Sequence, residues 1–374
     1  MKIIEVTSKK LKKQFIDFPH DLYADDPNYV PEVFIGQKDL MNEAKNPFFK
    51  HSKATLFLAK KGEEIVGRIA AIRNNNYNEF IGVGTKGFFG FFDVIEDYEV
   101  AKLLLDTVSN WCKKENLNAL MGPTNFSTND TAGLLVEGFD RPPVVSMTYN
   151  KLYFKEFLER YGFEKSMDML AYHVTEEEAN MKAVKLASRL EERLAGRGIT
   201  IRKINMKKFD AEIDKLEKVY IKAWDKNWGF VPPTSEEFQH LGADLKLIAD
   251  PELVLLAEED GKTVGFVGAI PDMNMVLKKV KRGRLFPFGI FKILFGKKKI
   301  TRIRVLLLGV LEEYRGRGIE GILYAKVISN ALNKGYTQAE ASWVLDNNEM
   351  MKRGVEGVNM KPYKRYRIYE KKLA

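Results

Sequence analysis

One stretch decides the fold: Val305-Leu306-Leu307-Leu308-Gly309-Val310-Leu311-Glu312-Glu313-Tyr314-Arg315-Gly316-Arg317-Gly318-Ile319-Glu320-Gly321-Ile322-Leu323. It opens as a short apolar run that is typical of a buried strand. It then crosses a charged turn containing glycines. Beyond that turn, apolar residues recur at a spacing that puts them on one face of a helix: Ile319, Ile322, Leu323, Val327 and Ala331. The sequence therefore predicts a strand, a basic glycine-containing loop and the N-terminus of a helix.

This arrangement suits a phosphate group. The first N–H groups of a helix have no intrahelical partner, and they lie at the positive end of the helix dipole. Gly316 and Gly318 let the backbone approach a diphosphate without a Cβ in the way, and Arg315 and Arg317 add positive charge. The alternative is a tight turn that carries glycine for steric reasons alone.

The order Arg315-x-x-Gly318-x-Glu320 resembles the acyl-CoA loop of the GNAT N-acyltransferases, whose pattern is Gln/Arg-x-x-Gly-x-Gly/Ala. Glu320 departs from that pattern, and its carboxylate is expected to repel a diphosphate. The resemblance implies that acyl-CoA or acetyl-CoA is a co-substrate and that the backbone N–H groups of Val310 and Leu311 face its thioester. The remaining alternative is a GNAT-like turn that has lost its cofactor. The implied cofactor-binding residues are Val310, Leu311, Arg315, Gly316, Arg317, Gly318, Ile319 and Glu320.

The chain of 374 residues has room for two domains, and its two halves repeat one order of elements. Each half reads as helix, hairpin, strand, long helix, strand, short helix and strand. This order predicts an α/β protein with two tandem GNAT-like domains, whose mixed, mostly antiparallel sheets are flanked by helices. We expect an N-terminal domain without a cofactor loop at 1–175, a linking helix at 176–198, and a C-terminal domain with the acyl-CoA loop at 199–374.

Three regions resemble a group of bacterial tandem GNAT-like proteins that includes bacterial ceramide synthases. They are Asn46–His51, Gly122–Ser127 with Gly133–Pro143, and Ser342–Asn348 with Tyr363–Tyr369. Ceramide synthases move a fatty acyl group from an acyl thioester to a long-chain amine. The resemblance thus implies an N-acyltransferase that acts on an amine, with a sphingoid base at the membrane surface as one candidate. The alternative is a catalytically inactive GNAT-fold adaptor that binds lipid or protein.

Acyl transfer requires that the amine lose a proton and that the departing thiolate gain one. In the GNAT arrangement, Glu312 or Glu313 lies close enough to assist deprotonation through water, although either residue fits a solvated loop equally well. Val355 occupies the place of the tyrosine that often serves as the family's acid. Tyr366 is therefore a candidate acid, with packing as its alternative, and Asn347 is a candidate for holding the pantetheine amides.

The first half carries a dense polar run between a predicted strand and a glycine-containing loop. Asn125, Ser127 and Asn129 belong to this run. Their amide and hydroxyl groups could bind the head group of an amino alcohol. The commoner use of such residues is to form turns by hydrogen bonding to the nearby backbone.

The segment Leu277–Ile300 holds nine Lys and Arg and no acidic residue, which equals the net charge of +9. The rest of the chain is balanced, so we do not expect nucleic acid as a partner. Phe288 and Phe291 lie in an apolar run inside this segment. The combination predicts contact with an anionic membrane surface. The alternative is a buried hairpin insert that covers the sheet.

The remaining composition points to a reducing compartment. A single cysteine excludes a disulfide framework, and Cys112 lies on the apolar side of a predicted helix. The four histidines have no metal-ligand spacing, so no metal site is expected.

The start of the chain lacks a signal-peptide core, and no apolar run reaches the ~18 residues of a spanning helix. A cytoplasmic protein, peripheral on the inner face of the membrane, is expected.

Overall fold

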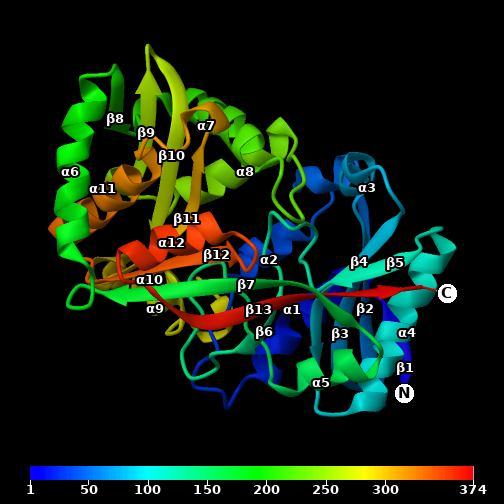
Figure 1. Cartoon of the computed structure of the whole chain (residues 1–374). Helices are drawn as coiled ribbons and strands as arrows, with labels where there is room; N and C mark the ends of the chain where they lie inside the picture. Colours follow the sequence, from blue (N-terminus) through cyan, green and yellow to red (C-terminus); the bar gives the residue numbers. More distant parts are fainter. Residues whose placement is uncertain (374) are drawn as a thin grey trace. The chain divides into compact units, whose positions relative to one another are not determined.

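The computed structural model describes residues 1–373, which form two compact units. Unit 1 comprises Met1–Asp168, Asn274–Gly296 and Arg365–Ala374, and unit 2 comprises Met169–Met273 and Lys297–Lys364. Each unit is a sheet flanked by helices (Figure 1).

In unit 1, the strand order across the sheet is β1, β2, β3, β4, β5 and β13, and β6 also pairs with β13. Every one of these pairs is antiparallel except β4 with β5. The strands are β1 (Lys2–Glu5), β2 (Lys53–Lys61), β3 (Glu64–Arg73), β4 (Lys86–Val94), β5 (Ala119–Gly122), β6 (Leu134–Glu137) and β13 (Lys361–Lys372). The helices are α1 (Lys9–Leu22), α2 (Phe34–Leu40), α3 (Asn75–Ile81), α4 (Tyr98–Lys114), α5 (Tyr153–Arg160), α9 (Asn274–Leu277) and α10 (Gly289–Gly296).

Unit 2 repeats this plan with the order β8, β9, β10, β11, β12 and β7. Here too one pair is parallel, β11 with β12. The strands are β7 (Glu164–Thr175), β8 (Ile199–Lys203), β9 (Val254–Glu259), β10 (Lys262–Pro271), β11 (Arg302–Val310) and β12 (Gln338–Leu345). The helices are α6 (Met181–Ala195), α7 (Phe209–Trp224), α8 (Ser235–Lys246), α11 (Ile319–Asn333) and α12 (Glu349–Gly357).

The parallel pair is short in both units. Pairing of β4 with β5 ends at Phe88, and pairing of β11 with β12 ends at Val305. The pairing of each fourth strand with the third contains a register shift. It lies between Arg68 and Ala70 of β3, where β4 has the extra residue, and between Gly268 and Ala269 of β10, where β11 has the extra residue. A bulge bends its strand and increases the local twist. Each unit therefore has a fork between its fourth and fifth strands.

The last strand of each sheet pairs with a strand that is distant in sequence. β13 completes the sheet of unit 1 through Arg365–Lys372, whereas β7 completes the sheet of unit 2 through Met169–Thr175. The boundaries predicted at residues 175 and 199 follow the sequence repeat, and they stay a prediction. The compact units differ from that division because strand pairing joins segments that are distant in sequence.

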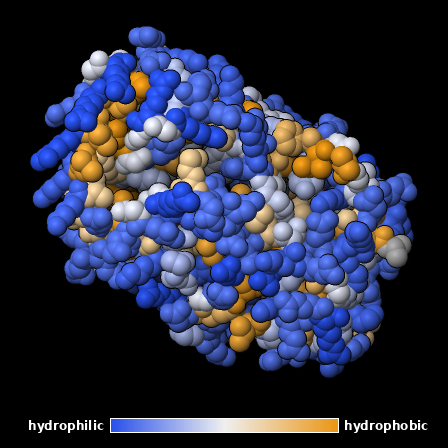
Figure 2. Space-filling view, in the orientation of Figure 1, coloured by the Kyte–Doolittle hydropathy of each residue, from blue (hydrophilic) through white to orange (hydrophobic). Residues whose placement is uncertain are grey.

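The core of unit 1 includes the apolar face of α4, where Val100, Leu104, Val108 and Cys112 have no exposed surface. Asp97 caps this helix by accepting a hydrogen bond from the Glu99 N–H. Burial raises the pKa of the Cys112 thiol to about 12, so the thiol stays protonated at neutral pH. The predicted packing role of Cys112 is confirmed. On the face shown in Figure 2 the surface is mostly hydrophilic, as expected for a chain with 30% charged residues.

Candidate functional site

The predicted strand, loop and helix are present in unit 2 as β11, a 3-10 turn at Glu312–Tyr314, and α11. Gly318 takes the N-cap position of α11 in the left-handed conformation, with φ of 86°, and offers no side-chain cap. An added Cβ at Gly316 or Gly318 would meet no atom within 4 Å, so both face open space. The N–H groups of the first turn of α11 are therefore approachable, which fits a diphosphate.

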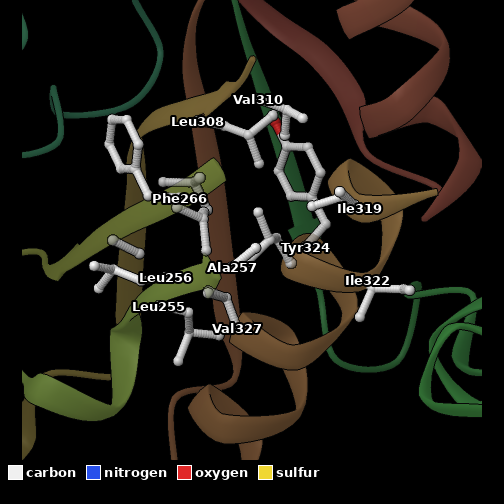
Figure 3. Close-up of a cluster of buried hydrophobic side chains, with 14 of the residues drawn as sticks. Leu255, Leu256, Ala257, Phe266, Leu308, Val310, Ile319, Ile322, Tyr324 and Val327 are labelled. Carbon is white, nitrogen blue, oxygen red and sulfur yellow. The ribbon is translucent and has the colours of Figure 1, made fainter. Parts of the chain in front are cut away.

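Hydrophobic packing fixes the position of this helix start. Figure 3 shows Ile319, Tyr324 and Val327 of α11 beside Val310 of β11 and Ala257 of β9. The five residues predicted to form one buried helix face are all at most 4% exposed: Ile319, Ile322, Leu323, Val327 and Ala331. The predicted helix face is confirmed. The loop is thus held between a buried strand and a buried helix face.

Two residues predicted to bind the cofactor make hydrogen bonds to the protein backbone, and their roles at a cofactor stay predictions. The Leu311 N–H, expected to face a thioester, donates to the Val264 carbonyl at 2.9 Å because the contact between β10 and β11 continues past the end of β11. The Arg315 guanidinium, expected to add charge for a phosphate, donates to the backbone carbonyls of Val310 at 3.2 Å and Ala223 at 2.8 Å. Arg315 thereby ties the loop to α7. These hydrogen bonds hold the loop in position and engage the guanidinium group that is predicted to face a phosphate.

Arg317 keeps a more accessible charge. Its side chain is 46% exposed and lies over the ring of Tyr314, 4.6 Å from the ring centre. It also donates to the Glu313 carbonyl at 3.0 Å. Glu320 lies in the first turn of α11, and its Oε1 atom is buried with no hydrogen-bond partner in the described chain. A carboxylate there is stabilised by the helix dipole and competes with an anionic ligand.

Comparison with known proteins assigns the chain to a family. Residues 213–353 match the Acetyltransferase (GNAT) family. Protein YghO from Escherichia coli is 34% identical over 370 residues, which cover 96% of this chain and 93% of that protein. A protein from Caulobacter vibrioides named Bacterial ceramide synthase is 33% identical over 379 residues, which cover 100% and 98% respectively. The chain belongs to the GNAT family.

Solved structures of GNAT proteins share the fold. A tandem GNAT protein from the clavulanic acid biosynthesis pathway has a TM-score of 0.60 at 10% identity, covering 100% of this chain and 98% of that one. A GCN5-related N-acetyltransferase from Sphaerobacter thermophilus has a TM-score of 0.52 at 13% identity, covering 99% and 96%. Both likenesses extend over nearly the whole chain. The predicted tandem GNAT fold is confirmed.

Glu312 and Glu313, the two residues predicted to assist deprotonation, lie beside the predicted cofactor loop and are exposed to solvent. The Glu312 carboxylate is 65% exposed and pairs with the Lys226 ammonium at 2.7 Å. That hydrogen bond holds the pKa of Glu312 below its usual range, so the carboxylate is ionised at neutral pH. Glu313 is 60% exposed and lies 4.0 Å from Lys262. Neither is buried, so a role in deprotonation stays a prediction.

The other predicted catalytic residues are placed differently. Asn347 lies in an exposed turn after β12 of unit 2. Tyr366 belongs to unit 1 and is fully buried. Val355 on α12 is also fully buried and brings no hydroxyl to the place of the family's usual tyrosine. The structure therefore groups Glu312 and Glu313 with the loop. The roles of Tyr366 and Asn347 stay predictions.

A buried polar cluster at the fork of unit 2 was missed from the sequence. Arg304 and Glu340 are partners near the end of the β11–β12 pairing, and they are 1% and 0% exposed. The Ser342 hydroxyl donates to Glu340 Oε1 at 2.6 Å, and Arg304 Nε donates to the Ser342 hydroxyl oxygen at 2.9 Å. The Tyr363 hydroxyl donates to the other oxygen of Glu340. The signal in the sequence is a glutamate at the start of the mostly apolar run Ala339–Leu345.

Replacing Glu340 with leucine should destabilise the protein by about 3 kcal/mol, because it removes the acceptor shared by the buried Ser342 hydroxyl and the half-buried Tyr363 hydroxyl, and the carboxyl group beside a buried arginine. Urea unfolding is the measurement. Glu349→Leu is the control, since that side chain is 66% exposed and its loss should lower the free energy of unfolding much less. Equal effects of the two substitutions would contradict a structural role for the cluster.

The polar run predicted to bind a head group lines part of unit 1. Asn125 accepts a hydrogen bond from the Phe91 N–H at 2.9 Å and donates to Thr131 at 2.8 Å. Ser127 accepts from the Asn129 N–H at 3.0 Å. These are the turn-forming bonds of the alternative interpretation. Asn125 also lines a cavity of about 370 Å³, so binding of a head group stays a prediction.

The basic segment Leu277–Ile300 is anchored at its base and exposed at its tip. Arg282 and Arg284 pair with Asp21 and Asp17 of α1 at 2.7 and 2.9 Å. The apolar side chains of the tip are exposed by 54–78%: Phe286, Phe288, Phe291, Leu294 and Phe295. The alternative of a buried insert is therefore wrong for Phe288 and Phe291. None of the described helices is long and apolar enough to cross a membrane.

Proposed function

We propose that the protein is an N-acyltransferase that moves an acyl group from acyl-CoA to an amine, and that the amine is a long-chain base of the sphingoid type. The proposal rests on one observation: Gly318, the N-cap of α11, faces open space, so the first N–H groups of the helix are approachable. They lie at the loop that resembles the cofactor loop of the GNAT family. The full-length similarity to a protein named Bacterial ceramide synthase supports a lipid-like acceptor.

The chemistry needs few protein groups. Acyl-CoA supplies an activated carbonyl carbon, and the amine nitrogen attacks it while the carbon–sulfur bond breaks and the sulfur takes up a proton. The first turn of α11 and Arg317 would hold the diphosphate. The exposed carboxylates of Glu312 and Glu313 are available to pass the amine proton to water. Arg315 would keep the loop in place from behind.

The acceptor is expected to come from a membrane. A long-chain amine is dissolved in the bilayer, so an enzyme that uses it benefits from an apolar surface element. The exposed aromatic tip of Leu277–Ile300 supplies such an element in unit 1. We therefore propose a peripheral protein on the cytoplasmic face of the inner membrane. Head-group recognition by Asn125, Ser127 and Asn129 belongs to the same proposal.

Incubation of the protein with hexadecanoyl-CoA and a panel of amines, followed by mass spectrometry, tests the reaction. We expect an amide product with sphinganine and at least a ten-fold lower yield with ethanolamine, which lacks the long chain. The Gly318→Val variant serves as the matched control and should give no product. If acyl-CoA binds but no amide forms with any amine, the protein is a GNAT-fold adaptor instead.

A further inference from the structure

A second cavity lies in unit 2, on the face of the sheet that α7 and α8 cover. Its volume is about 70 Å³. The walls include Phe209 and Ile213 from α7, Leu241 and Leu245 from α8, Gly268 from β10, and Leu307 from β11. The only charged residue at its edge is Lys246, whose ammonium lies over the Phe209 ring, 4.5 Å from the centre. An apolar cavity of this kind does not hold water well and favours hydrocarbon.

The cavity is lined in part by β11, the strand that leads to the predicted cofactor loop. At the bulge between β10 and β11, Gly268 pairs with Leu307 and Ala269 pairs with Val305, so Leu306 has no partner on β10. Leu306 and Leu307 both line the cavity. Leu307 is three residues before Val310, which corresponds to roughly 10 Å along a strand. A long acyl chain attached at the end of β11 is therefore long enough to span this distance.

The apolar walls determine which part of the two reactants can bind in the cavity. A charged ammonium or a diphosphate has no partner there, and burying either without one is strongly unfavourable. A saturated chain needs no partner. One water-sized group occupies about 10–15 Å³ of such space, so the cavity admits about five methylene groups without rearrangement. This is the size of the far part of an acyl chain, not of a whole lipid.

We propose that this cavity under α7 and α8 binds the acyl chain of the thioester and sets the preferred chain length. The inference rests on the proposed function, because it assumes that an acyl-CoA binds at the end of β11. Gly268 is the position that controls the depth of the cavity. An added Cβ there would meet only the Leu307 Cβ at 4.0 Å, and its backbone does not require glycine.

The test compares the binding of acetyl-CoA and hexadecanoyl-CoA by calorimetry. A leucine side chain at Gly268 would occupy part of the cavity. Burying one methylene changes affinity about four-fold, so Gly268→Leu should weaken hexadecanoyl-CoA by about fifteen-fold if two methylenes are displaced. Acetyl-CoA, which does not reach the cavity, should bind as before. Gly354→Leu is the control, because Gly354 is exposed on α12 and has nothing within 4 Å.

A compensating variant separates occupancy from misfolding. Ile213 lines the cavity opposite the strands, so Ile213→Ala combined with Gly268→Leu should restore most of the affinity for hexadecanoyl-CoA. Equal losses for both thioesters, no loss for either, or a dependence on the chain of the amine in place of the thioester would overturn the proposal. If the unchanged protein binds neither thioester, the proposed function itself has failed.

Discussion

Gly318→Val is expected to abolish binding of acetyl-CoA, with at least a hundred-fold loss of affinity. Gly318 is the N-cap of α11 at φ of 86°, a conformation that a β-branched residue adopts only at a cost of about 1–2 kcal/mol. The valine side chain would also stand in the open space through which a diphosphate approaches the helix N–H groups. Hydrogen bonds to a charged group contribute about 1.5–3 kcal/mol each, so losing two gives the expected factor.

The control for this experiment lies at the other end of the same helix. Gly335 follows α11 with φ of 83°, and an added Cβ there also meets nothing within 4 Å. Gly335→Val therefore introduces the same backbone strain away from the loop. Calorimetry and thermal unfolding should show that both variants lose similar stability and that only Gly318→Val loses binding. Similar affinities for both variants would rule out the start of α11 as the diphosphate site.

Local patterns predicted the elements of this site well. The helix predicted at Gly318–Asn333 is α11 at Ile319–Asn333, because apolar residues at helical spacing face the sheet. Gly316 and Gly318 of the loop have positive φ values of 75° and 86°, which glycine adopts without strain. These features depend on residues within one turn or one strand, so the sequence carries them directly.

Contacts between distant segments were not predictable in the same way. The hydrogen bond from Arg315 to the Ala223 carbonyl joins residues 92 positions apart. It holds the loop against α7, a contact that the loop sequence alone does not reveal. The cluster around Glu340 forms only where β11, β12 and Tyr363 meet. The cavity beside Gly268 lies where a bulge leaves Leu306 without a partner on β10. Each of these features depends on register, and the sequence pattern alone does not fix register.

The second large effect is expected on membrane binding by the exposed apolar side chains of the basic segment Leu277–Ile300. Phe288 and Phe291 are 72% and 54% exposed, so replacing both with serine should leave the fold intact. Burial of one such aromatic side chain in a membrane interface contributes about 1.5–3 kcal/mol. Losing both should weaken binding to anionic vesicles by about a hundred-fold or more. Cosedimentation with vesicles of phosphatidylglycerol and phosphatidylcholine is the measurement.

The positive charge of the basic segment predicts how vesicle binding depends on salt and on anionic lipid. Arg282 and Arg284 are paired with aspartates of α1, so the lysines of the segment, each contributing about 1 kcal/mol near an anionic surface, should carry most of the attraction. Binding should therefore weaken as salt rises or as the anionic lipid is removed. The control is Phe80→Ser with Val83→Ser, which removes two exposed apolar residues at the end of α3. If the control and the Phe288 and Phe291 variant bind vesicles equally well, α10 does not contact the membrane. An acceptor drawn from the bilayer would then lose its structural support.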